Sequence, residues 1–172
     1  MSLLAVTVIG HDRPGIIAET TGMLAELGGN LEDSTMTILR GHFAMVLLVS
    51  GDASAADVDS ALQPMTDDGS LLVSVREVPV EDGVAATGTA HLLSVHGADR
   101  PGIVSAVAGV VAQAGGNITD LSTRLTGDLY VLLAEVDLPP SADIPTVTGE
   151  LQGVAGSLGV EAALRPLDTD VL

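Results

Sequence analysis

The sequence contains no cysteine, no lysine and no tryptophan. Without cysteine there is no disulfide framework, no thiol nucleophile and no thiolate metal site, which fits a reducing compartment. The only aromatic residues are Phe43 and Tyr130, and six arginines stand against 23 acidic residues, for a net charge of −17. Direct nucleic-acid binding relies on clustered cations and stacking aromatics, so this composition argues against it.

Long apolar runs are also missing. No stretch approaches the roughly 20 residues of a membrane-spanning helix. The apolar start of the chain has no cationic residue before it and is interrupted after Ile9, so a signal peptide is not expected. The net charge also disfavours an anionic membrane surface. We therefore expect an acidic, soluble protein of the cytoplasm.

The sequence does contain an internal repeat. Residues 10–16 read Gly-His-Asp-Arg-Pro-Gly-Ile, and residues 97–103 read Gly-Ala-Asp-Arg-Pro-Gly-Ile, at an offset of 87 residues. The Gly-Gly-Asn of residues 28–30 returns at residues 115–117 with the same offset. Shared spacing over this length, without a gap, indicates a duplicated unit.

Two copies within 172 residues predict two small domains, at residues 1–80 and 90–172, joined by a linker at residues 81–89. The linker region, Glu-Asp-Gly-Val-Ala-Ala-Thr-Gly-Thr, has the composition of a flexible connection. Each domain of about 80 residues has a modest core, so packing against another domain or another chain would add stability.

Both copies are predicted to run strand, helix, strand, strand, helix, strand. In the first copy, Pro14 suits the first helical position, and Gly28 suits the end of that helix. The continuous apolar run 43–49 predicts a strand buried on both faces. Ser54 suits the N-cap of the second helix. The predicted strands of the first copy are residues 3–9, 31–39, 43–49 and 71–75.

This order of elements predicts an α+β, ferredoxin-like βαββαβ fold, with an antiparallel sheet and both helices on one face. The uncovered face and the edge strands would need partners. Pairing between the copies, or between chains as a homodimer, is therefore expected.

The repeated loop lies between the first strand and the first helix. Backbone amides at a helix N-terminus suit a carboxylate, Asp12 can pair with an ammonium group, and Asn30 offers a donor and an acceptor. Together they would form a reader of zwitterions such as amino acids. The same residues also have a purely structural interpretation, because Asp before Pro-Gly commonly starts a helix and Asn after Gly-Gly commonly caps or turns the chain.

The order of elements and motifs in each copy resembles the ACT domain, a regulatory module that often binds amino acids. This order is a strand, Asp-Arg-Pro-Gly-Ile, an amphipathic helix, Gly-Gly-Asn and a hairpin. In the first copy, residues 30–34, 36–39 and 43–51 also resemble the glycine cleavage system transcriptional repressor family, whose members are tandem ACT domains. The resemblance implies a non-enzymatic regulator without a cofactor. It further implies an amino acid or similar effector, and a protein partner in place of direct DNA contact.

In that family the ligand lies between the strand-to-helix loop and the start of the second strand, often where two ACT domains abut. The second copy differs, with Ala98 where the first has His11 and Leu121 where it has Ser34, so it is expected to bind weakly or to serve as a structural partner. The implied ligand-binding residues are Gly10, His11, Asp12, Arg13, Pro14, Gly15, Ile16 and Asn30 in the first copy and Asp99, Arg100, Pro101, Gly102, Ile103 and Asn117 in the second.

An enzyme is the weaker alternative. No Gly-Xaa-Ser-Xaa-Gly elbow is present. His91 and His96 are five residues apart on one predicted strand, which aims them at opposite faces and prevents them from sharing a metal. A ligand-free interaction module is the stronger alternative. The two interpretations differ in whether Asp12 and Asn30 converge on an open pocket or are occupied in capping their own helix and turn.

Overall fold

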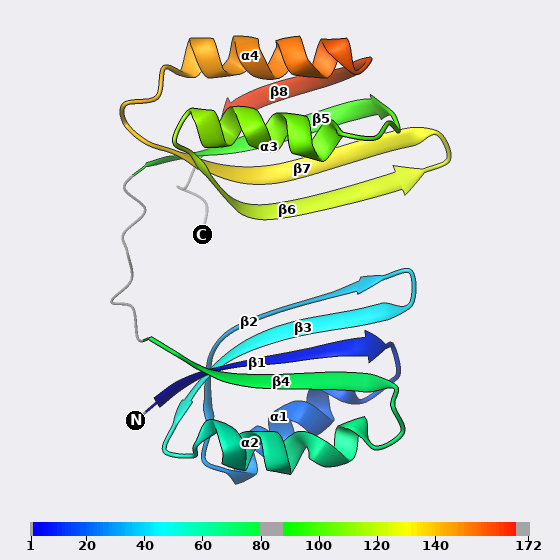
Figure 1. Cartoon of the computed structure of the whole chain (residues 1–172), viewed down its shortest axis with the longest axis vertical. Coiled ribbons are helices and arrows are strands. Elements are labelled where there is room, and N and C mark those ends of the chain that lie inside the picture. The colour runs from blue at the N-terminus through cyan, green and yellow to red at the C-terminus, as the bar shows by residue number, and fades with distance from the viewer. Residues whose placement is uncertain (1, 80–87, 168–172) are drawn as a thin grey trace. The chain divides into compact units, whose positions relative to one another are not determined.

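The computed structural model describes residues 2–79 and 88–167, and the chain divides into two compact units, residues 1–82 and 83–172 (unit 1 and unit 2). Each unit has a four-stranded antiparallel sheet and two α-helices (Figure 1), which confirms the predicted ferredoxin-like α+β fold. Most of the predicted linker lies outside the described residues, and its last residue, Thr89, is the first residue of a strand.

The units share one topology. Strand order is β2-β3-β1-β4 in unit 1 and β6-β7-β5-β8 in unit 2. The elements of unit 1 are β1 (Ser2–His11), α1 (Ile16–Glu26), β2 (Asn30–Leu39), β3 (His42–Gly51), α2 (Ala55–Leu62), the short 3₁₀ helix η1 (Gln63–Thr66) and β4 (Leu71–Val78). Those of unit 2 are β5 (Thr89–Ala98), α3 (Ile103–Gln113), β6 (Asn117–Thr126), β7 (Leu129–Leu138), α4 (Ile144–Ser157) and β8 (Val160–Pro166).

The turns follow from local sequence. Arg40 and Gly41 both have positive φ, 51° and 84°, as expected for a two-residue hairpin whose twist matches that of the strands. Gly28 is left-handed at φ 74°. Its N–H donates to Ala25 and the N–H of Gly29 to Leu24, which is the glycine-terminated helix end that the sequence predicts.

The second helix of unit 1 begins at a capping box, as Ser54 predicts. The Ser54 side chain accepts a hydrogen bond from the Asp57 N–H, and the Asp57 side chain accepts one from the Ser54 N–H. The Ser54 hydroxyl also donates to the same carboxylate at 2.6 Å. These hydrogen bonds lower the pKa of Asp57 from 3.8.

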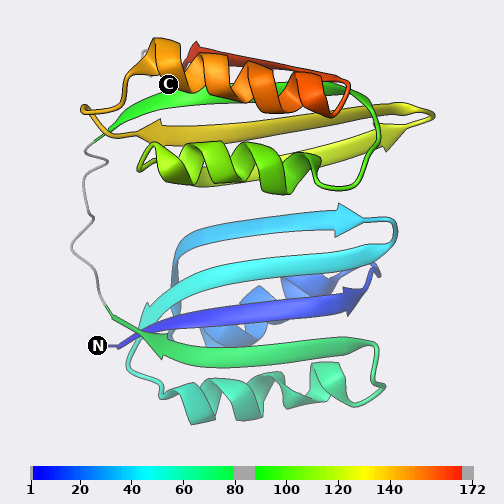
Figure 2. The same cartoon turned by 45° about the horizontal axis from the view of Figure 1, so that its top comes forward.

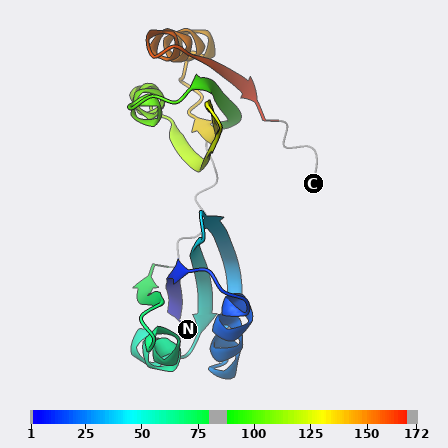
Figure 3. The same ribbon diagram turned by 90° about the vertical axis from the view of Figure 1, so that its right-hand side faces the viewer.

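The core of each unit lies between the sheet and its helices. In unit 2, α3 and α4 lie side by side on one face of the sheet (Figure 3). In unit 1, the helix-facing residues of β3 are buried, but Val46 between them is 41% exposed. The prediction that residues 43–49 are buried on both faces is therefore wrong, because both helices lie on one side and the other side is uncovered.

The uncovered side of the unit 1 sheet, the open face, carries exposed apolar side chains. Ile9 and Leu72 are opposite each other in the β1–β4 ladder and are 47% and 70% exposed. The edge strand β2 is exposed along its whole length, and Figure 2 shows it beside β3 with no strand of its own unit on the other side. The sheet therefore offers both a face and an edge to a partner.

Candidate functional site

The β1–α1 loop of unit 1 is fixed on both sides by backbone hydrogen bonds. The His11 N–H donates to the Ser70 carbonyl and the Asp12 N–H donates to the Gly41 carbonyl, both at 3.0 Å. Gly10, one residue earlier, lies opposite Phe43 in β3 and Leu71 in β4. The loop is thus attached to both neighbours of β1, which holds Asp12 at one end of the sheet.

No side chain of the described residues caps the start of α1. The helix begins at Ile16, and the N-cap is Gly15 in the left-handed region at φ 92°. Pro14 therefore precedes the helix, and the prediction that it takes the first helical position is wrong. The first helical hydrogen bond joins the Glu19 N–H to the Gly15 carbonyl at 2.9 Å, so the N–H groups before Glu19 lack acceptors within the helix. These N–H groups, together with the helix dipole, favour an anionic group at this end.

The two charged side chains of the loop differ in what they contact. The Arg13 guanidinium donates to the Glu19 carboxylate at 2.7 Å. The pKa of Asp68 is lowered mainly by hydrogen bonds from Ser70, and the positive charge of Arg13 lowers it further. Within the described residues, the Asp12 carboxylate forms no hydrogen bond and no ion pair. Asp12 is thus the available charge of the loop, while Arg13 is neutralised.

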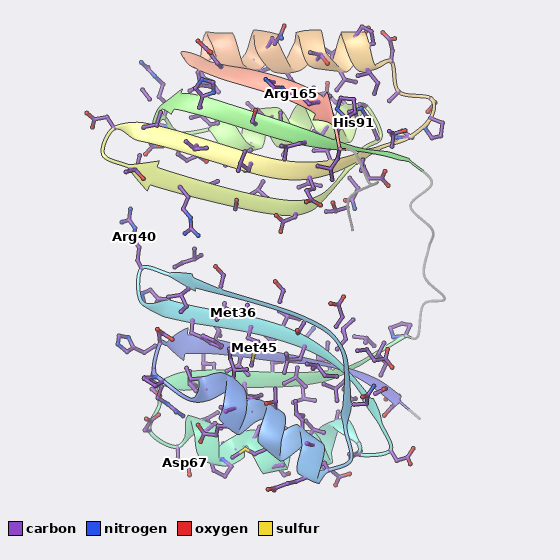
Figure 4. The ribbon with its side chains drawn as sticks, turned by 180° about the vertical axis from the view of Figure 1, so that it is seen from behind. Met36, Arg40, Met45, Asp67, His91 and Arg165 are labelled. Atoms are coloured by element: carbon purple, nitrogen blue, oxygen red, sulfur yellow. The ribbon has the colours of Figure 1, made fainter. Side chains whose placement is uncertain are left out.

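A pocket of about 430 Å³ opens beside this loop, between α1 and the C-terminal part of β2. We call it the α1–β2 pocket. Its volume falls within the range of roughly 300–1,000 Å³ that is typical of small-molecule sites. Met36 lies on β2 directly across from Met45 on β3 (Figure 4). The pocket is lined by Asp12, Arg13, Gly15, Ile16, Ile17, Ala18, Met36, Ile38 and Phe43.

Four of the predicted site residues thus line the pocket: Asp12, Arg13, Gly15 and Ile16. Sequence reasoning missed the lining from β2 and β3. The signal that could have found it is the hairpin register, which places Ile38 opposite Phe43 and Phe43 opposite Gly10. Gly10 itself leaves no room for a side chain, since a Cβ there would lie 2.1 Å from the Ser70 carbonyl oxygen.

Asn30 is the predicted site residue that the fold separates from the loop. It is the first residue of β2 and lies opposite Ser50, whereas Ile38 of the pocket lies near the other end of that strand. Eight residues of strand correspond to about 26 Å. Within unit 1, Asp12 and Asn30 therefore do not share a pocket.

Unit 2 repeats the backbone of the loop with different side chains around it. Gly102 is the left-handed N-cap of α3 at φ 94°, and Pro101 again precedes the helix. Ala106 stands where unit 1 has Glu19, so Arg100 lacks that acid, and its guanidinium lies against the turn at Gly159. The Asn117 end of β6 lies opposite Asp137, far from the loop, as Asn30 does in unit 1.

The apolar end of the pocket is also changed in unit 2. Tyr130 stands at the position of Phe43, and Thr123 at that of Met36. Burial raises the pKa of the Tyr130 hydroxyl, a hydrogen bond with Thr123 lowers it and the Asp99 charge raises it further. Asp99, Thr123 and Tyr130 are therefore close together, and this corner of unit 2 is polar.

The histidines of β5 face opposite sides of the sheet, as predicted. His91 is 3% exposed, and its Nδ1 lies 2.8 Å from the Thr89 carbonyl oxygen. His96 is exposed and lies 3.4 Å from the Glu161 carboxylate. In the described part of the chain, no three His, Cys, Asp or Glu side chains are grouped to hold a metal ion. Nor is any described helix both long and apolar enough to span a membrane.

The fold places the chain in the class of tandem ferredoxin-like α+β domains. In each unit the helix after the first strand has a glycine N-cap. Residues 2–76 and 91–152 each match a family model described as the ACT domain. The chain therefore belongs to the ACT-domain family and carries two ACT domains in tandem.

The sequence relatives include UPF0237 proteins. The one from Methanopyrus kandleri is 55% identical over 58 residues, which are 34% of this chain and 62% of the relative. The one from Corynebacterium diphtheriae is 34% identical over 82 residues, or 46% of this chain and 92% of the relative. The chain spans 53% of the length of a Streptococcus pneumoniae relative, at 45% identity over 27% of this chain.

Solved structures also match almost the whole chain. An unknown protein from Galdieria sulphuraria is 31% identical, with a TM-score of 0.81 over 96% of this chain and 98% of that one. A protein described as a glycine cleavage system transcriptional repressor is 19% identical, with a TM-score of 0.71 over 96% of this chain and 97% of that one. At this identity the second match shows a shared fold.

Proposed function

We propose that the protein is a non-enzymatic regulator that binds an amino acid in the α1–β2 pocket of unit 1. The observation that carries the proposal comes from the rim of one pocket, where, among the described residues, the Asp12 carboxylate has no partner and lies near helix N–H groups that lack acceptors within the helix. An ammonium group has a partner in the carboxylate, and a carboxylate group has partners in the N–H groups. These are the two charged groups that every free amino acid carries.

The regulated target would be a protein, reached by association of ACT domains within a homodimer or with a partner such as a transcriptional regulator. Two features support this output. The net charge of −17 opposes direct nucleic-acid binding, and β2 is an exposed edge strand, which favours pairing with another chain. The likeness to the glycine cleavage repressor suggests cytoplasmic control of amino-acid metabolism.

A thermal-shift panel of the common free amino acids tests the binding proposal on the full chain. A ligand at a hundred times its dissociation constant stabilises the folded state of unit 1 by about 2.7 kcal/mol, which for a unit of about 80 residues raises its Tm by roughly 10–20 °C. The shift should be lost in Asp12→Ala. It should persist in Asn30→Ala, because Asn30 lies at the opposite end of β2. A flat panel with folded protein would refute amino-acid binding.

The second candidate function is a ligand-free interaction module. It is favoured by the apolar open face of unit 1, where Ile9, Val46 and Leu72 are 47%, 41% and 70% exposed. Exposed apolar surface of this kind marks protein interaction sites. Under this alternative, self-association measured by sedimentation would be the same with and without every amino acid, and Leu72→Asp would weaken it.

A further inference from the structure

We propose that the α1–β2 pocket selects an amino acid with a large apolar side chain, such as leucine or methionine, and discriminates against glycine. This inference rests on the proposed function and specifies its ligand. It follows from the division of the pocket into a charged rim at the loop and an apolar wall that continues along β2.

The apolar wall consists of side chains that remain exposed in the unit itself. Ile17, Met36 and Ile38 are 45%, 42% and 44% exposed, and all three line the pocket together with the buried ring of Phe43. Covering such side chains releases their apolar surface from water. Glycine has no side chain with which to do so, whereas a leucine or methionine side chain does.

The charges of the rim determine the orientation of the ligand. Glu19 neutralises Arg13, so among the described residues the charged side chain of the rim without a partner is the exposed Asp12 carboxylate, which can pair with a cation. The N–H groups of Ile16 and Ile17 lack acceptors within the helix and take the ligand carboxylate. With both charged groups held at the loop, the side chain of the ligand extends toward Met36 and Ile38.

Unit 2 provides an internal contrast for this assignment. Its loop has the same backbone conformation, with the N-cap glycine at φ 94° against 92° in unit 1. The residues at the Met36 and Phe43 positions are Thr123 and Tyr130, which are hydroxylated. Val104 and Leu125 keep apolar side chains at the positions of Ile17 and Ile38. The difference in selectivity between the units therefore rests on Met36 and Phe43.

Isothermal titration calorimetry on the full chain tests the inference with leucine, methionine, glycine, serine and N-acetylleucine. Leucine or methionine should bind at least tenfold more tightly than glycine, which corresponds to about 1.4 kcal/mol. N-acetylleucine, which lacks the ammonium group, should bind at least tenfold more weakly than leucine. Asp12→Asn and Met36→Thr should each weaken leucine binding. The matched controls are Asp59→Asn, an exposed acid of α2, and Leu72→Thr on the open face, and both should bind leucine as the wild type does.

The outcomes separate this inference from the function on which it rests. If glycine or serine binds as tightly as leucine and the binding is lost in Asp12→Asn, the amino-acid site stands and the apolar selectivity is refuted. If no amino acid binds, both proposals fail. If leucine binds equally well to Asp12→Asn and Met36→Thr, the ligand lies elsewhere, and the assignment to this pocket is overturned.

Discussion

The substitution Gly10→Ala tests how tightly β1 is held where the loop begins. A Cβ at Gly10 would lie 2.1 Å from the Ser70 carbonyl oxygen and 2.9 Å from the Leu71 Cα. Both are backbone atoms, so no side-chain rotation relieves the contact. The same carbonyl accepts the hydrogen bond from the His11 N–H at 3.0 Å. The added methyl group must therefore separate β1 from β4 at the end of the sheet that positions Asp12.

The loss of unfolding free energy in Gly10→Ala has two contributions. Inserting a methyl group into a filled space costs about 1–3 kcal/mol, and loss of one hydrogen bond adds about 1 kcal/mol. The free energy of unfolding of unit 1 should therefore fall by about 2–4 kcal/mol. For a unit of about 80 residues this lowers Tm by on the order of 10–20 °C. At Gly97, the matching position of unit 2, the closest atom is a methyl carbon of Val160 at 2.8 Å, so Gly97→Ala should cost less.

Thermal unfolding of the full chain followed by circular dichroism gives the first readout. Tyr130 is the only tyrosine and tryptophan is absent, so tyrosine fluorescence reports on unit 2. Gly10→Ala should lower the temperature of the unit 1 transition seen by circular dichroism. The unit 2 transition seen by tyrosine fluorescence should keep its temperature. Gly22→Ala is the matched control, because Gly22 lies inside α1 with nothing within 4 Å of an added Cβ, and it should stabilise by about 0.5–1 kcal/mol. A Gly10→Ala protein as stable as wild type would refute the steric argument.

Three further predictions concern single side chains. Ser54→Ala should cost about 0.5–2 kcal/mol. Because the capping box lowers the folded pKa of Asp57 below 3.8, its contribution is present above that pH, and the loss should shrink in urea titrations as the pH falls through the folded value. Tyr130 should ionise above pH 10.0 in ultraviolet titrations, and Asp99→Asn should bring the midpoint closer to that value. Since the raised pKa favours the protonated form, its contribution to stability is lost as the pH rises through the folded value. Asp12→Ala should change the free energy of unfolding by less than about 0.5 kcal/mol, and a larger loss would show that Asp12 has a structural role.

The repeat and the local capping signals were sufficient to predict the fold. Ser54 and Gly28 each fix one helix boundary through a local rule, and each boundary is found where the sequence placed it. The 87-residue offset then required both halves to share one topology. These features depend on neighbouring residues, which is why the sequence alone was enough.

The pocket depends on contacts that sequence spacing does not show. Asp12 and Ile38 are 26 residues apart in the sequence, and they meet because β2 runs antiparallel to β3 and returns toward the loop. Asn30 is at the other end of β2 from Ile38, and it therefore lies far from Asp12. The start of α1 was also misplaced, because Pro14 satisfies the rule for a first helical residue, whereas the left-handed turn at Gly15 begins the helix two residues later.

Comparison of the two units separates the backbone frame of the site from its chemistry. Gly10 and Gly97 both lack room for a side chain, and Gly15 and Gly102 adopt φ of 92° and 94°. These glycines impose the same loop on both units, with an acid at the same place. Residues that do not shape the loop differ between the units. One such position is Met36 in unit 1 and Thr123 in unit 2, where the side chain of the proposed ligand would lie. Under the proposed function, this shared loop would hold the charged groups of an amino acid in either unit and the strand residues would select its side chain, so the two ACT domains need not respond to the same effector.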